Sequence, residues 1–185
     1  MKLLVLIIDK YQEIEVYGFL GALNRSQKLE KITYWNPDGA TKVQGSNKIG
    51  FIETINSDIN PEDYDAIFVP GGAACINLRT NEKALNLIKK FVELDNKWVF
   101  AICDGPNAIY ENHILDDKSY SSFPIENINN IGSQKRTKEY INVDGKYITG
   151  KCPSAAIDLG IKVIEILYGK ELANKAYYGL YGLEK

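Results

Sequence analysis

Short apolar runs alternate along this chain with segments of helical periodicity, and this alternation constrains the fold more than any other feature. Four runs are predicted to be strands, at residues 2–8, 31–35, 63–70 and 98–102. The first is continuously apolar and contains β-branched residues, which is typical of a parallel strand covered on both faces. The sequence therefore predicts an α/β fold with a mostly parallel sheet and helices on both faces.

The remaining segments complete this pattern. Helices are expected at residues 13–25, 81–95, 106–112 and 153–167. Residues 41–53 resemble a hairpin, and residues 139–149 form a second one around Asp144-Gly145, a strong two-residue turn signal. A chain of 185 residues can bury one core and is short for two. With no repeat or linker visible, we expect a single domain over residues 1–185.

Composition and charge exclude several classes of partner. The net charge of -2 gives no basic surface for nucleic acid or an anionic membrane. The apolar N-terminal segment stops before signal-peptide length, and no run approaches the roughly 20 apolar residues of a membrane span. Cys75, Cys103 and Cys152 are odd in number and far apart, so they match neither a disulfide framework nor a zinc site. We expect a cytoplasmic protein, and no phosphate loop or ligand cluster indicates a cofactor or metal.

Three strand ends carry residues suited to chemistry. The first strand leads into a helix that starts with Glu13 and Glu15, and the third ends in Gly71-Gly72. The fourth ends in Cys103, where the apolar run stops and a Gly-Pro turn begins. Because ligands of open α/β sheets bind at the carboxyl ends of the strands, these residues are expected to lie close together. They would supply a nucleophile, an acid and backbone N–H donors for a developing oxyanion.

These motifs, in this order, resemble a known family. The segment EIE after the first strand, VPGG after the third, AICDGP at the fourth and the closing DGKYITGKCPSAAIDLGIKVIEILYGKELA are similar to the ThiJ/PfpI family, also called DJ-1/PfpI. The resemblance covers nearly the whole chain. It implies a flavodoxin-like, three-layer α/β sandwich related to class I glutamine amidotransferases.

The resemblance also implies roles for individual residues. Cys103 matches the nucleophilic cysteine, which stands on a strained turn at a helix N-terminus that favours the thiolate. Glu15 matches a protonated glutamate that donates a hydrogen bond to this thiolate. Gly71 and Gly72 match glycines whose amides face the cysteine, joined by the amide of Asp104.

The resemblance further implies a homodimer. Arg25 matches a basic residue near the dimer interface of close relatives, and we count it among the candidate substrate-binding residues. The hairpin around residues 45–50 and the first helix offer a plausible interface. The tyrosine-rich tail is expected to serve packing or the dimer surface.

One expected residue type is missing. Many relatives have a histidine directly after the cysteine or before a proline some twenty residues later, and here Asp104 and Phe123 occupy these places. The chain has a single histidine, His113, which is expected in a surface loop. A hydrolytic Cys-His pair is therefore absent, and peptidase activity is not expected.

Structural explanations compete with each functional one. Cys103 could be an inert core thiol, Glu15 a first-turn acid that complements the helix dipole, and Gly71-Gly72 an ordinary turn. Asp104 could stabilise the start of the next helix, or it could act as an acid–base group whose charge would raise the pKa of the thiol.

Two classes of function follow from these residues. In the first, a small-molecule enzyme, Cys103 attacks a carbonyl, Glu15 moves protons, and the amides of Gly72 and Asp104 hold the oxyanion. The resemblance implies a glyoxalase, deglycase or amidase step. In the second, a non-catalytic stress protein, Cys103 is oxidised to a sulfinic acid as a sensor, or the protein surface acts as a holdase. Cys75 and Cys152 are expected to be plain small hydrophobic residues, although either could lie near Cys103.

Overall fold

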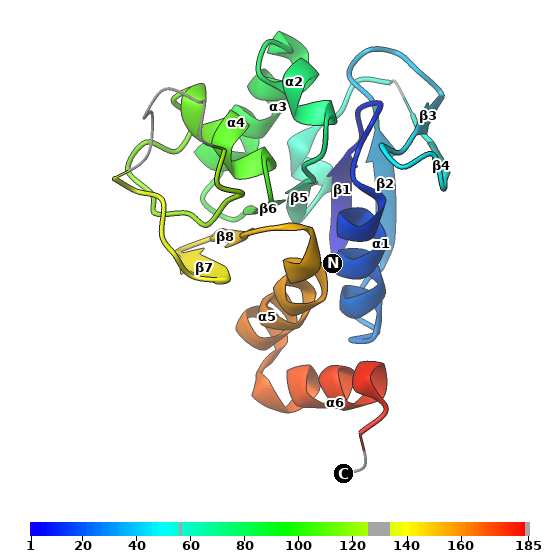
Figure 1. The fold of residues 1–185 in the computed structure, drawn as a ribbon, viewed down its shortest axis with the longest axis vertical. Coiled ribbons are helices and arrows are strands. Elements are labelled where there is room, and N and C mark those ends of the chain that lie inside the picture. The colour runs from blue at the N-terminus through cyan, green and yellow to red at the C-terminus, as the bar shows by residue number, and fades with distance from the viewer. Residues whose placement is uncertain (56, 126–133, 184–185) are drawn as a thin grey trace.

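The computed structural model describes residues 1–55, 57–125 and 134–183, and a six-stranded sheet forms its centre (Figure 1). The strand order is β2-β1-β5-β6-β8-β7, and every neighbouring pair is parallel except the β7–β8 hairpin at one edge. The strands are β1 (Lys2–Leu6), β2 (Lys31–Trp35), β5 (Ala66–Val69), β6 (Trp98–Ile102), β7 (Ile141–Asp144) and β8 (Tyr147–Gly150).

Helices cover both faces of this sheet. One apolar layer joins it to α1 (Glu13–Asn24), α5 (Ala156–Tyr168) and α6 (Lys170–Tyr181), and the other to α2 (Ala74–Leu78), α3 (Glu82–Glu93) and α4 (Gly105–Glu111). Successive residues of β6 alternate between the layers: Phe100 packs with the first and Ala101 with the second. This arrangement is the flavodoxin-like three-layer sandwich that the sequence predicts. No helix in the described part of the chain is long and apolar enough to cross a membrane.

The strands agree with the predicted runs more closely than the short helices do. The third strand is shorter than predicted because Pro61–Asp63 forms a 3-10 turn ahead of it. A second such turn, Pro153–Ala155, precedes α5. Two helices, α2 and α6, are not among the predicted elements. The tyrosine-rich tail belongs to α6, with Ala173 and Ala176 buried against the core.

The predicted hairpin near residue 45 is present as β3 (Lys42–Gln44) and β4 (Phe51–Glu53). The buried carboxylate of Glu13 holds it on α1 by accepting hydrogen bonds from the backbone N–H of Asn47 at 3.0 Å and of Ile49 at 3.2 Å. Burial works to raise the pKa of Glu13, but these hydrogen bonds lower it on balance. Glu13 is therefore a structural clamp that keeps its charge.

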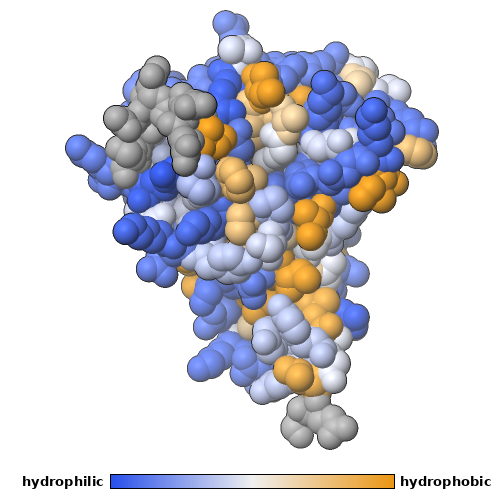
Figure 2. Space-filling view, in the orientation of Figure 1, coloured by the Kyte–Doolittle hydropathy of each residue, from blue (hydrophilic) through white to orange (hydrophobic). Residues whose placement is uncertain are grey.

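The outer surface of α1 and the hairpin is partly apolar. Apolar side chains gather over these elements on the right of Figure 2. The exposed large side chains of this surface are Ile14, Tyr17, Ile49 and Phe51. We call these four residues the α1–hairpin surface.

Candidate functional site

Cys103 stands on a strained turn between β6 and α4. Its φ is +60°, a left-handed conformation that residues other than glycine rarely adopt. The turn is fixed on both sides, because the N–H of Cys103 donates to the carbonyl of Gly150 at 2.9 Å and its carbonyl accepts from the N–H of Phe123 at 2.8 Å. A strained backbone conformation of this kind persists only where the surrounding structure holds it in place, and such conformations are common at functional sites. The residue is 6% exposed.

Glu15 enters the same place from the first turn of α1. Its side chain is fully buried, and Oε2 accepts a hydrogen bond from the N–H of Gly71 at 2.5 Å. Burial raises the pKa of Glu15 to about 8, although the Gly71 N–H and the Cys103 thiol oppose the increase. Oε1 is buried and has no hydrogen-bond partner among the described residues. Glu15 is therefore a protonated acid at neutral pH, with an oxygen available for a group bound beside it.

Gly71 is the point at which these groups converge. A Cβ added to Gly71 would lie 2.9 Å from Cys103 Cβ, 2.9 Å from the backbone nitrogen of Asp104 and 3.0 Å from Glu15 Oε2. The absence of a side chain at this residue therefore allows the thiol, the acid and the amide to meet.

Gly72 has a different structural role. Its φ is +87°, it forms an isolated bridge with Tyr11, and a Cβ there would lie 2.7 Å from the backbone nitrogen of Gln12. It thus joins the loop after β5 to the loop after β1, next to the group around Gly71. Its predicted part in an oxyanion site stays a prediction.

The thiol and the carboxyl of Cys103 and Glu15 titrate as a coupled pair. Burial raises the pKa of Cys103, the charge of an ionised Glu15 raises it further, and the backbone N–H of Asp104 lowers it. One negative charge on the pair is thus far more favourable than two. When Glu15 keeps its proton, the contribution of its charge disappears, while burial still raises the pKa of the thiol and the Asp104 N–H lowers it.

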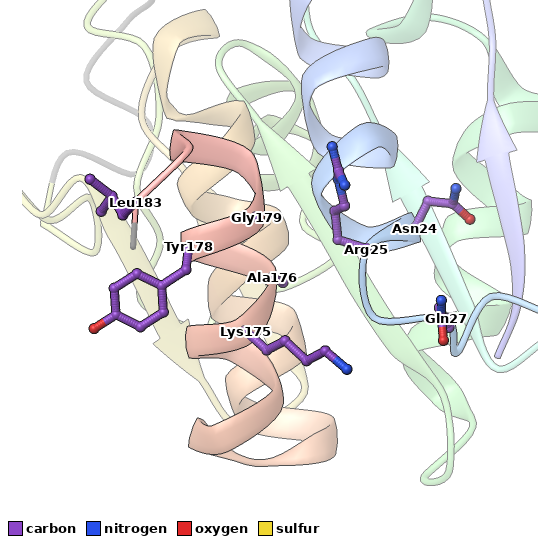
Figure 3. Close-up of a pocket in the computed structure, with 8 residues that line it drawn as sticks. All are labelled: Asn24, Arg25, Gln27, Lys175, Ala176, Tyr178, Gly179 and Leu183. Carbon is purple, nitrogen blue, oxygen red and sulfur yellow. The ribbon is translucent and has the colours of Figure 1, made fainter. Parts of the chain in front are cut away.

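The structure does not bring Arg25 together with the other candidate residues. It follows the last residue of α1, about 15 Å along the helix axis from Glu15 at 1.5 Å per residue. There it lines a separate hollow of about 790 Å³ with Lys175 and Gly179 of α6 (Figure 3). Arg25 therefore lies apart from a site around Cys103 within this chain.

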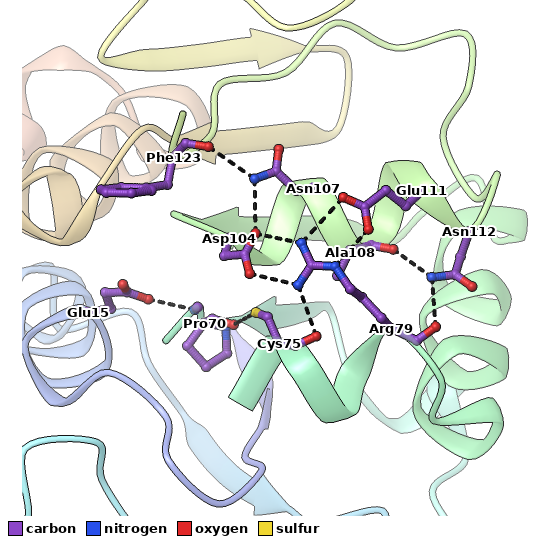
Figure 4. A network of polar contacts seen from close by, with 11 residues as sticks. Glu15, Pro70, Cys75, Arg79, Asp104, Asn107, Ala108, Glu111, Asn112 and Phe123 are labelled. Atoms are coloured by element: carbon purple, nitrogen blue, oxygen red, sulfur yellow. Dashed lines mark hydrogen bonds and ion pairs between the residues drawn. The ribbon is translucent and has the colours of Figure 1, made fainter. Parts of the chain in front are cut away.

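The side chain of Asp104 belongs to an ion-pair network. Its two oxygens accept hydrogen bonds from Arg79 Nη1 at 2.7 Å and Nη2 at 2.8 Å, and Arg79 Nε donates to Glu111 at 2.7 Å (Figure 4). Asn107 donates to Asp104 Oδ1 at 3.0 Å and to the carbonyl of Phe123 at 3.0 Å. No side-chain bond from Asp104 caps α4. Sequence reasoning misses Arg79, because no local pattern marks a partner 25 residues away from Asp104.

Within the described part of the chain, the other two cysteines and the single histidine have no contact that points to a catalytic role. Cys75 is fully buried in α2, and burial raises the pKa of its thiol. Cys152 is half-buried, with its sulfur 3.2 Å from Ser154 Oγ. His113 is exposed and pairs with Asp116, as a surface loop residue would. Among the described residues, no group of three histidine, cysteine, aspartate or glutamate side chains could hold a metal ion.

Comparisons with known proteins bear on the family of this chain. The sequence profile of the DJ-1/PfpI family matches residues 1–166. A protein named deglycase from Thermococcus kodakarensis is 31% identical over 83% of this chain and 91% of its own length. DJ-1 homolog B of Arabidopsis thaliana is 27% identical over 92% of this chain, which is 39% of that longer protein.

Solved structures agree at the level of the fold. The oxidized DJ-1 of Toxoplasma gondii superimposes with a TM-score of 0.80 at 24% identity, covering 97% of each chain. The profile match extends over nearly the whole chain, as the motifs at the strand ends predict. The chain belongs to the DJ-1/PfpI family.

Proposed function

We propose that this protein is a cysteine-dependent enzyme that converts small α-oxoaldehydes such as methylglyoxal into α-hydroxy acids. The observation that carries the proposal is the pairing of a buried, protonated Glu15 with Cys103 on a strained turn. An acid that keeps its proton at neutral pH can deliver it and take it back during a reaction. The name deglycase of an archaeal relative supports a carbonyl substrate.

In the proposed reaction, the sulfur of Cys103 forms a bond to the aldehyde carbon, and the carbonyl electron pair moves to oxygen. The N–H of Asp104 stabilises this oxygen, which ends with the proton that the thiol loses. Glu15 then gives its proton to the neighbouring ketone oxygen and takes the hydrogen of the former aldehyde carbon as a proton, which leaves an enediol. It passes this proton to the former ketone carbon and recovers a proton from the hydroxyl group of the first carbon. The first carbon is oxidised to a thioester while the second is reduced to an alcohol.

Water completes the cycle by breaking the carbon–sulfur bond. The products are an α-hydroxy acid and the free thiol of Cys103. The sum is one α-oxoaldehyde and one water giving one hydroxy acid, so that no external oxidant or reductant is needed.

The proposal is tested by turnover. Wild-type protein should consume methylglyoxal and form lactate, and Cys103→Ala and Glu15→Gln should each lower kcat by at least about 100-fold, the lower range for a lost acid–base or nucleophilic group. Cys152→Ala serves as the matched cysteine control and should keep most of the activity. Equal turnover in wild type and Cys103→Ala would refute the proposal.

A second candidate is a redox sensor for oxidative stress. It is favoured by the position of the single histidine, His113, which is exposed and pairs with Asp116. In this account two molecules of hydrogen peroxide convert the Cys103 thiol into a sulfinic acid and leave two waters. Glu15 would then donate a hydrogen bond to the sulfinate. Stoichiometric peroxide consumption without methylglyoxal turnover would favour this candidate.

We further propose that the protein acts as a cytoplasmic homodimer of single-domain protomers. The α1–hairpin surface supports a second copy as partner, because its large apolar side chains are exposed and contiguous apolar surface is typical of interfaces. The free state of Cys75, Cys103 and Cys152 is consistent with a reducing compartment.

A further inference from the structure

The side chain of Asp104, the acid that directly follows Cys103, has no role in the proposed reaction. A carboxylate directly after Cys103 should oppose ionisation of the thiol through its charge. Both oxygens of Asp104, however, are engaged by the guanidinium of Arg79, in the two-point geometry that gives the strongest pairs of this kind. Oδ1 also accepts from Asn107.

The pair is shielded from water. The side chains of Arg79, Asp104 and Glu111 are 21%, 12% and 13% exposed. In such surroundings an ion pair is screened little by salt, and an arginine removed from it would leave carboxylates unpaired. The hydrogen bonds to Asp104 and Glu111 also raise the pKa of Arg79, so the guanidinium stays charged at any pH of interest.

The network also fixes the position of the turn. Arg79 reaches Asp104 from the end of α2, and its Nη1 donates to the carbonyl of Cys75 at 3.1 Å. Asn107 connects the carboxylate of Asp104 to the carbonyl of Phe123, whose N–H holds the carbonyl of Cys103. The guanidinium is therefore linked through hydrogen bonds to the strained residue itself.

We propose that Arg79 is a positioning residue that compensates the Asp104 carboxylate, so that Asp104 serves the site through its backbone N–H and not as an acid, a base or a free charge. This inference rests on the proposed role of Cys103. It replaces the alternative in which Asp104 is an acid–base group whose charge raises the pKa of the thiol. The titratable groups that act on the Cys103 thiol are Glu15 and Cys75, whereas Asp104, Arg79 and Glu111 act on the neighbouring thiol of Cys75.

A double-mutant cycle tests the proposal. The rate of iodoacetamide alkylation of Cys103 is measured by peptide mass spectrometry from pH 6 to pH 10 in wild type, Asp104→Asn, Arg79→Met and the double variant. Asp104→Asn should change the rate by less than about threefold, because its charge is already compensated. Arg79→Met should slow alkylation about tenfold, equivalent to one pKa unit of the thiol, and Asp104→Asn should recover most of this loss in the Arg79→Met background.

Two controls separate this effect from general loosening of the fold. Arg25→Met removes an arginine at the far end of α1 and should leave the pH profile of Cys103 unchanged. Alkylation of Cys152 in the same molecules should not follow the network variants. If Arg79→Met does not fold, the Asp104→Asn variant alone tests the proposal. A change of more than threefold in the rate of Cys103 alkylation, in either direction, then overturns it.

An equal effect of Asp104→Asn in both backgrounds would also overturn it. Failure of the proposed function alone gives a different result. The effects of the Arg79 and Asp104 variants on alkylation are then still non-additive, but wild-type protein does not convert methylglyoxal.

Discussion

At the scale of single residues, the site depends on one acid that keeps its proton and one glycine that makes room for it. Glu15 has its raised pKa because it is fully buried, and Gly71 lets the thiol, the carboxyl and an amide meet at one point. The sequence motifs predict that both residues lie at the strand ends, and the structure brings them together. Arg79 is not predicted from the sequence, because its pairing with Asp104 depends on how α2 is placed against α4 and leaves no periodic or spacing signal.

The pH dependence of stability should report the proton on Glu15. Between the unfolded pKa of 4.5 and the native value of about 8, the native state holds a proton that the unfolded chain has lost. The free energy of unfolding should therefore fall as the pH rises through this range, by about 2 kcal/mol between pH 6 and pH 8. Urea titrations at several pH values measure this. Glu15→Gln should remove most of the slope, and an identical slope in both proteins would contradict the assignment.

Gly71→Ala should damage the site through crowding. The new Cβ would stand within 3.0 Å of Cys103, Asp104 and Glu15, so the free energy of unfolding should fall by about 1–3 kcal/mol and Cys103 alkylation should change. Gly21→Ala in α1 is the matched control. Beyond the neighbouring backbone of α1, no atom of the described residues lies within 4 Å of its new Cβ, and alanine should stabilise the helix by about 0.5–1 kcal/mol. Equal stabilities of the two variants in denaturant titration would contradict the geometry.

At the scale of elements, the sequence predicts the buried strands well and the short helices poorly. β6 has the predicted bounds because its continuous apolar run leaves few alternatives, and β2 has them although Lys31 and Thr33 interrupt its apolar residues. α2 has five residues, too few for a helical period to be visible. α6 buries mainly small residues and exposes Tyr177, Tyr178 and Tyr181, so its pattern has no apolar stripe to detect.

The β3–β4 hairpin should depend on Glu13. Glu13→Ala removes the acceptor for the amides of Asn47 and Ile49, and hydrogen bonds to a charged group are worth about 1.5–3 kcal/mol. The hydrogen exchange of these two amides should become at least about tenfold faster. The control is Glu53→Ala on the exposed side of β4, which should leave their exchange unchanged. Unchanged exchange in Glu13→Ala would show that the clamp contributes little.

At the scale of the whole molecule, the fold brings together the carboxyl ends of three strands that are far apart in the sequence. β1, β5 and β6 are neighbours, so residues 15, 71 and 103 meet although the chain separates them widely. The sequence predicts this meeting because carboxyl ends of parallel strands share an edge. The sequence does not predict that Arg25 lies far from Cys103. The role of Arg25 comes from the resemblance, and its distance from Glu15 follows from the length of α1.

Assembly can be tested at the α1–hairpin surface. Wild-type protein should have about twice the mass of the 20.8 kDa chain by light scattering, and Ile49→Asp should shift it toward the monomer because the charge would be buried against the second copy. Ile166→Asp, at an exposed apolar residue of α5, should remain dimeric. A wild-type monomer at micromolar concentration would refute the dimer.

The central claim is that Cys103 is the reactive thiol of this chain, and competitive labelling tests it most directly. Native protein is treated briefly with iodoacetamide at pH 7.5, and the three cysteine peptides are quantified by mass spectrometry. Cys103 is expected to be labelled first, ahead of the half-buried Cys152 and the fully buried Cys75, because it stands on the strained turn where the Asp104 N–H stabilises its thiolate. Equal labelling of the three cysteines, or labelling of Cys152 before Cys103, would contradict it.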